Sequence, residues 1–117
     1  MITTLASSFL PVSDPAAAAA WYAERFGLTV AEVHEHAAVL DDRDGRRLAL
    51  LGPASGIAAE PGLPWAAVSF RAPDVRAFRE ECRDAGVPCS DVRGDAATCL
   101  FVTVEDPDGG TVLVVDR

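Results

Sequence analysis

The chain has 117 residues, half of them apolar, and its 18 acidic residues outnumber its 10 basic residues to give a net charge of −8. This length suits one compact domain with a substantial core. The negative charge repels phosphate groups, so we expect no nucleic acid and no anionic membrane as a partner, and it favours neutral or cationic ligands. A simpler role of the charge is to keep the protein soluble.

No stretch reaches the 18 or more apolar residues that a membrane-spanning helix needs. The three cysteines, Cys82, Cys89 and Cys99, are an odd number and lack the C-x-x-C spacing of zinc sites. We therefore expect neither a disulfide framework nor a zinc site, and reduced thiols in a cytoplasmic protein.

Two motifs occur twice along the chain. Val12-Ser13-Asp14-Pro15 and Ala72-Pro73-Asp74-Val75 each open a helical pattern. Asp42-Arg43-Asp44-Gly45 and Asp106-Pro107-Asp108-Gly109 each precede a short apolar strand. The repeats predict two copies of one module, each with the order β-α-β-β-β.

In the first module, Asp14 can cap a helix whose first position is Pro15, and Gly27 is a natural stop for this helix. The module is expected to contain strands over residues 5–12, 29–34, 37–40 and 47–51 and a helix over residues 15–26. The tight turn over residues 42–45 joins the last two strands.

The second module repeats this order after a segment rich in proline and glycine, residues 52–64. Its helix is capped by Asp74 and has Val75, Phe78, Cys82 and Ala85 on one face. Strands are expected over residues 65–70, 89–93, 99–104 and 111–115. The prediction is an α+β fold with two tandem modules of curved mixed sheets around a cleft. We expect one domain, with module one over about 1–52, a linker over about 53–64 and module two over about 65–117.

This arrangement resembles the vicinal oxygen chelate superfamily of glyoxalases, extradiol dioxygenases, fosfomycin-resistance enzymes and bleomycin-resistance proteins. The likeness lies in Leu10-Pro11-Val12-Ser13-Asp14, in Trp21-Tyr22 through Phe26-Gly27-Leu28, in Asp106-Pro107-Asp108-Gly109 and in the repeat. The fold hosts many activities, so the resemblance implies an architecture and not one reaction.

The resemblance also implies where metal ligands would lie. In metal-dependent members a His usually lies seven residues before the helix-capping Asp, and a Glu lies five residues after the turn Asp that precedes Gly. These positions correspond to Ser7, Ala67, Ala49 and Leu113 in this chain. None of the four offers an imidazole or a carboxylate, so we expect the usual metal centre to be absent and no cofactor to be bound.

Strand alternation places aromatic side chains next to these four positions. Phe9 accompanies Ser7, Trp65 accompanies Ala67, and Phe101 shares a strand face with Thr103. An apolar cavity with aromatic walls suits a flat organic molecule. The expected ligand-binding residues are Ser7, Phe9, Ala49, Trp65, Ala67, Phe101 and Leu113. On the last strand, alternation turns Thr111 and Val115 the same way as Leu113.

The aromatic residues also have a simpler explanation as packing residues. Trp65 can seal the edge of the core, Phe9 and Phe101 can be ordinary packing residues, and Trp21 and Tyr22 match a pair that packs on the sheet. His34-Glu35-His36 places two imidazoles on one side of a strand but has no third metal ligand close in sequence, so a solvated hairpin is the simpler reading.

The expected function is metal-independent binding and sequestration of a small hydrophobic or aromatic compound, as in bleomycin-resistance-type antibiotic-binding proteins. We expect a homodimer and no catalytic residues. The alternative is a glyoxalase-like metal-dependent lyase, isomerase or dioxygenase whose ligands lie at other positions. A third possibility is an accessory subunit that binds no ligand.

Overall fold

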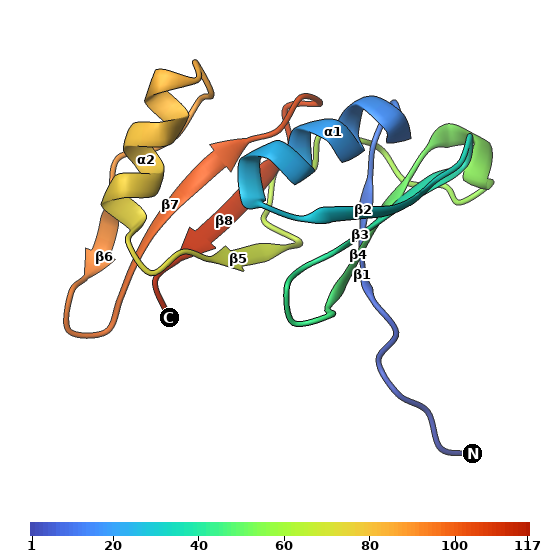
Figure 1. Cartoon of the computed structure of the whole chain (residues 1–117), viewed down its shortest axis with the longest axis horizontal. Coiled ribbons are helices and arrows are strands. Elements are labelled where there is room, and N and C mark those ends of the chain that lie inside the picture. Colours follow the sequence, from blue (N-terminus) through green and yellow to red (C-terminus); the bar gives the residue numbers. More distant parts are fainter. The chain divides into compact units, whose positions relative to one another are not determined.

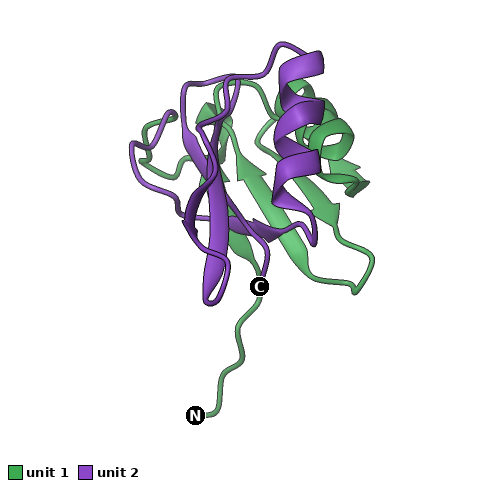
Figure 2. Ribbon diagram, turned by 90° about the vertical axis from the view of Figure 1, so that its left-hand side faces the viewer, with its two compact units in different colours: residues 1–61 green, residues 62–117 purple.

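Both halves of the chain fold into the same order of elements in the computed structural model, which describes residues 1–117 (Figure 1). Two units result, residues 1–61 and residues 62–117 (Figure 2). Unit 1 contains β1 (Ser8–Pro11), α1 (Pro15–Phe26), β2 (Thr29–Val33), β3 (Ala37–Asp41), β4 (Arg47–Leu51) and the short 3₁₀ helix η1 (Pro53–Ser55). Unit 2 contains β5 (Ser69–Arg71), α2 (Val75–Asp84), β6 (Arg93–Asp95), β7 (Cys99–Glu105) and β8 (Thr111–Val115). The expected α+β fold with two similar modules is confirmed.

Each unit builds one four-stranded mixed sheet with the same connectivity. The strand orders are β1-β4-β3-β2 and β5-β8-β7-β6. The first strand of each unit lies parallel to the last one, and the other neighbours are antiparallel. Parallel strands cannot be joined by a tight turn, so the helix and the two middle strands make the crossover.

The two helices begin where the sequence predicts. The Asp14 side chain accepts a hydrogen bond from the Ala17 N–H at 3.2 Å, and the Asp74 side chain accepts one from the Ala77 N–H at 3.0 Å. These bonds satisfy backbone donors that have no partner inside the helix. Gly27 ends α1 with a φ of 68°, a conformation that glycine adopts without strain. Ala85 was expected on the buried face of α2, but the helix ends at Asp84 and Ala85 is exposed.

One face of each sheet forms the core under its helix. α1 contacts β2, β3 and β4, and α2 contacts β7. The side chains that face α1 include Leu10, Ala38, Leu40, Leu48 and Leu50, all at most 5% exposed. Their counterparts in unit 2 are Val102, Val104, Val112 and Val114, all at most 1% exposed. The alternate residues of β7 and β8 are half-buried or, at Glu105, exposed, which agrees with the predicted alternation.

The repeated aspartate motifs form the hairpin turns between the last two strands of each unit. Asp42 Oδ1 accepts hydrogen bonds from the Asp44 and Arg46 N–H groups at 2.9 and 2.8 Å. Asp106 Oδ1 accepts equivalent bonds from Asp108 and Gly110 at 3.0 and 2.7 Å. A carboxylate that bonds the backbone two and four residues later fixes the turn, as short polar side chains do at such positions.

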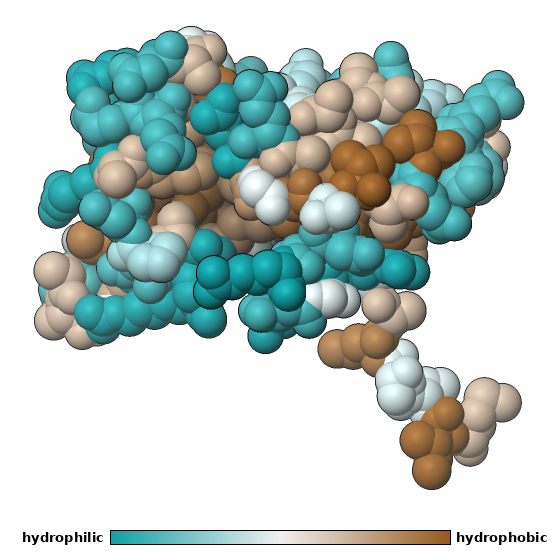
Figure 3. Space-filling model, viewed as in Figure 1, coloured by the Kyte–Doolittle hydropathy of each residue, from teal (hydrophilic) through white to brown (hydrophobic).

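Three strands differ from the predicted ranges. β1 begins at Ser8 and not at residue 5, and residues 1–6 form an exposed arm that projects from the sheet of unit 1 (Figures 1 and 3). β5 covers only Ser69–Arg71, because residues 63–68 bond to β8 through the Leu63 and Val68 carbonyls alone. The strand expected over residues 89–93 is wrong, since β6 spans Arg93–Asp95 and Cys89 makes only an isolated bridge to Val104.

A side chain explains the missing strand. The Ser90 hydroxyl accepts a hydrogen bond from the Thr103 N–H at 2.9 Å, so this donor of β7 bonds to a side chain and not to a neighbouring backbone.

Neither helix of the chain is long and apolar enough to cross a membrane.

Replacing Asp106 by Ala should destabilise the chain by about 1–3 kcal/mol, because two backbone N–H groups lose a buried acceptor. Asp106 is 8% exposed. Asp106→Asn keeps one oxygen acceptor and should lose less, and Asp42→Ala tests the equivalent turn of unit 1, where the carboxylate is less buried. Urea unfolding of the three variants measures these changes. Wild-type stability in Asp106→Ala would show that the turn does not depend on this carboxylate.

Candidate functional site

The face of each sheet that lies away from its helix carries the predicted ligand-binding residues, and we call it the helix-free face. In unit 1, Phe9 of β1 lies opposite Ala49 of β4, and Ala49 lies opposite Val39 of β3. Phe9 is 52% exposed although it is a large apolar residue, whereas Ala49 is buried. Ser7 lies before the first residue of β1 and is half-buried. The fold therefore brings Phe9 and Ala49 together, with Ser7 just beyond the strand.

In unit 2, Leu113 of β8 lies between Ser69 of β5 and Thr103 of β7. Phe101 lies opposite Val115, one diagonal step from Leu113, which is within reach of side-chain contact on one face of a sheet. Both Phe101 and Leu113 are half-buried. The helix-free face of unit 2 therefore combines apolar side chains with hydroxyl groups.

Trp65 and Ala67 precede β5 and are not part of the sheet. Their segment runs beside β8, because the Leu63 carbonyl accepts the Thr111 N–H at 2.9 Å and the Val68 carbonyl accepts the Leu113 N–H at 3.3 Å. Trp65 is 61% exposed, and Ala67 is half-buried. The seven predicted residues thus form two groups, one in each unit, and their union in one ligand site stays a prediction.

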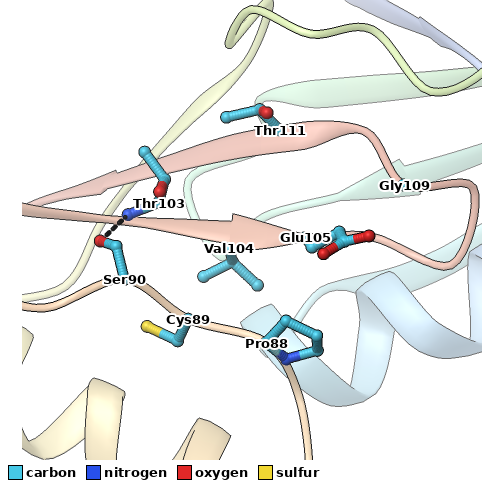
Figure 4. A pocket seen from close by; sticks show the side chains of 8 residues that line it. All are labelled: Pro88, Cys89, Ser90, Thr103, Val104, Glu105, Gly109 and Thr111. Atoms are coloured by element: carbon cyan, nitrogen blue, oxygen red, sulfur yellow. Dashed lines mark hydrogen bonds between the residues drawn. The ribbon is translucent and has the colours of Figure 1, made fainter.

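A pocket of about 440 Å³ lies at the edge of β7 in unit 2 (Figure 4). Its volume falls in the range of small-molecule sites. The lining residues are Pro88, Cys89, Ser90, Thr103, Val104, Glu105, Gly109 and Thr111. None of the seven predicted residues lines it. Three hydroxyl groups and the Glu105 carboxylate are the main polar groups of this lining. The pocket therefore favours hydrogen bonding over ring stacking.

The segment over residues 88–90, which forms one wall of the pocket, is held in place from two sides. The Arg79 guanidinium of α2 donates to the Ser90 carbonyl at 3.1 Å and to the Asp91 carboxylate at 2.9 Å. On the other side, the Ser90 N–H donates to the Thr103 carbonyl at 2.9 Å. This segment was missed because the sequence pattern predicts a strand there. Alternation did place Thr103 and Thr111 on the cavity side, but no signal in the sequence pointed to Ser90.

The pocket contains one thiol with a perturbed pKa. Burial raises the pKa of Cys89 above its ordinary value, while a hydrogen bond with Cys82 and the charge of Arg79 act in the opposite direction. Burial dominates, so the group is a thiol at neutral pH, and a thiol is a poor nucleophile. Cys99, the cysteine that alternation places on the cavity side, is half-buried, and its Sγ lies 3.5 Å from the Leu100 carbonyl oxygen.

No group of three or more His, Cys, Asp or Glu side chains is placed to hold a metal ion. The His34 and His36 rings do lie on one side of the β2–β3 hairpin, stacked with centroids 5.3 Å apart. Glu32 lies 3.8 Å from His34 in the same exposed hairpin. The residues at the four positions implied by the resemblance, Ser7, Ala49, Ala67 and Leu113, carry neither imidazole nor carboxylate groups, so this donor set does not fit the superfamily's usual metal.

These features agree with the comparisons with known proteins. The model of the Glyoxalase/Bleomycin resistance protein/Dioxygenase superfamily matches residues 3–114, and the chain belongs to this superfamily. No curated protein matches the chain in a sequence search.

Solved structures with the same fold carry different names. The oxidase ChaP-H2 has a TM-score of 0.73 and 18% identity over 100% of this chain and 95% of its own. A lactoylglutathione lyase from Agrobacterium tumefaciens has a TM-score of 0.75 and 17% identity, over 97% of this chain and 93% of its own. A bleomycin-binding protein complexed with bleomycin has a TM-score of 0.68 and 21% identity, over 98% of this chain and 99% of its own. At these identities the likeness establishes the fold alone.

Alkylation of Cys89 by iodoacetamide at pH 8 should be slower than alkylation of free cysteine, because the raised pKa leaves less thiolate. The neutral thiol is favoured in the folded state. Its contribution to stability is therefore present below the pKa of the unfolded chain and is lost as the pH rises through the folded pKa. Peptide mass spectrometry of labelled protein measures the rate, with the urea-unfolded chain as the control. Equal rates in the folded and unfolded chain would contradict the assignment.

Proposed function

We propose that this protein binds and sequesters a small hydrophobic or aromatic compound without the aid of a metal ion. The observation that carries the proposal is the exposure of large apolar side chains on or beside the helix-free faces, Phe9 at 52% and Trp65 at 61%. Water contact with such side chains is costly, and a flat ligand would remove it. Exposed apolar surface of this kind is typical of binding sites.

The chemistry of the neighbouring residues also favours binding over catalysis. Ala49 and Leu113 occupy the centres of the two helix-free faces, and neither can donate a proton or coordinate a metal. Cys89 is held as a thiol, and no histidine lies on a strand of unit 2. With no nucleophile and base within reach of each other, the faces offer shape and apolar area.

The bleomycin-binding protein among the solved structures supports this choice, since its name describes binding and not a reaction. The superfamily also contains lyases and oxidases, so a glyoxalase-like enzyme is the alternative function.

In this proposal the protein is a homodimer with two equivalent clefts, because association would cover the apolar faces. Light scattering against the mass of one chain, 12.3 kDa, tests that part.

Trp65→Ala should weaken the binding of planar aromatic compounds by about 1–3 kcal/mol, or roughly tenfold or more, through loss of ring contact. The fold should survive, since Trp65 lies outside the strands. Ile57→Ala is the matched control, because Ile57 is similarly exposed and lies on no strand. Titration calorimetry of a panel that includes bleomycin and polyaromatic compounds measures both. Unchanged affinity in Trp65→Ala would remove this residue from the site, and failure of the whole panel to bind would reject sequestration.

The purified protein should contain no stoichiometric metal, because the four implied ligand positions hold no imidazole or carboxylate. Elemental analysis, together with thermal melts in nickel, zinc, manganese and iron salts, measures this. One ion bound per chain with a rise of several degrees in melting temperature would favour the enzymatic alternative. A metal that binds without raising the melting temperature would indicate binding to the exposed hairpin that carries His34 and His36. In that case His36→Ala should abolish the binding.

A further inference from the structure

A row of four residues crosses the helix-free face of unit 2 with an arginine at each end. Arg71 of β5 lies opposite Val115 of β8, Val115 lies opposite Phe101 of β7, and Phe101 lies opposite Arg93 of β6. We call these four residues the arginine row. Neighbouring strands are about 4.8 Å apart, so the two arginine Cα atoms are separated by about 14 Å. Between them lies an apolar strip made by Val115 and Phe101.

Neither arginine has an acidic partner. Five of the ten arginines form ion pairs, namely Arg46, Arg47, Arg79, Arg83 and Arg117. Arg71 and Arg93 are exposed and make no ion pair and no side-chain hydrogen bond. Two unpaired positive charges on one face are notable in a chain of net charge −8.

The acidic residues nearest in sequence to the arginine row are engaged elsewhere. Asp74 accepts the Ala77 N–H and caps α2, and Asp91 pairs with Arg79. Asp95 Oδ1 accepts the Ala97 N–H at 2.8 Å and shapes the β6–β7 turn. Asp116 Oδ1 accepts the Leu100 N–H at 3.1 Å and lies 3.9 Å from the Arg117 guanidinium. The guanidinium groups of Arg71 and Arg93 therefore remain available to a ligand.

From this geometry we infer that the ligand is a planar aromatic carboxylate, with its ring on Phe101 and Val115 and its carboxylate on Arg71 or Arg93. The inference rests on the proposed binding function and names the ligand class. A guanidinium binds a carboxylate through two parallel hydrogen bonds and also stacks on flat rings. Charges are screened beyond about 8 Å at physiological ionic strength, so these two local charges outweigh the net charge of the chain. This reverses the sequence-based expectation of a neutral or cationic ligand.

Glu105 determines the orientation of such a ligand. It lies on the same strand face as Phe101, four residues and thus about 13 Å further along β7, opposite Thr111. A carboxylate would be repelled from that end of the face, which also borders the pocket. The anionic group is therefore favoured at an end of the arginine row and disfavoured beside Thr103 and Thr111.

Three probes with the same ring and different charge test the inference on the full chain: 2-naphthoate, 2-naphthamide and 2-naphthylmethylammonium. Titration calorimetry in 150 mM NaCl should find 2-naphthoate bound about tenfold more tightly than the cation, with the amide between them. At least one of the variants Arg71→Gln and Arg93→Gln should weaken 2-naphthoate about twofold or more, because one of the two arginines must hold most of the carboxylate, and the double variant should abolish the preference. Arg76→Gln, an exposed and unpaired arginine on α2, is the matched control and should change neither probe.

Salt gives an independent readout. Raising NaCl to 500 mM should reduce the preference for 2-naphthoate and leave 2-naphthamide unchanged. Equal affinity for the three probes, or wild-type affinity for 2-naphthoate in the double variant with an unchanged circular dichroism spectrum, would overturn the inference and leave the binding function in place. If none of the three probes bound, the inference would fail, and the wider panel that includes bleomycin would decide the proposed function.

Discussion

Burial of one sheet face under a helix is the interaction on which each unit of this chain depends. In unit 2 the four valines of β7 and β8 that face the helix are almost fully removed from water. Because side chains alternate along a strand, this burial also determines which residues point to the other side. A slip of one residue would exchange the two faces and expose the core, so the composition of the helix-free face is strongly specified.

Side-chain hydrogen bonds to the backbone set the register that this packing requires. Asp14 and Asp74 begin the two helices, and Asp42 and Asp106 close the hairpins between the last two strands. Each satisfies backbone N–H groups that would otherwise lack a partner. Arg79 acts at longer range, since it ties the segment after α2 to its own helix and so forms one wall of the pocket.

The helix-free faces show how one fold can serve both enzymes and binding proteins. Solved structures with this fold are named as an oxidase, a lyase and a bleomycin-binding protein, so the side chains and not the fold decide the chemistry. Here Ser7, Ala49, Ala67 and Leu113 occupy the implied ligand positions, and aromatic rings lie beside them. The free arginines add a charge preference that the net charge of the chain conceals. Such a surface is suited to recognition, because it combines apolar area with a few directed polar groups.

The sequence by itself determined the elements whose signals are local: the helix starts at Asp14 and Asp74, the stop at Gly27, the aspartate turns, and the strands at Arg47–Leu51 and Thr111–Val115. Capping, turn chemistry and alternation act within a few residues and can be read from one stretch of chain. The tertiary structure alone decided where β6 lies, how short β1 and β5 are, and which side chains line the pocket. It also decided which arginines are paired. Edge strands, ion pairs and cavities depend on residues far apart in the sequence, as when the Ser90 hydroxyl takes a backbone donor of β7. No local pattern contains that information.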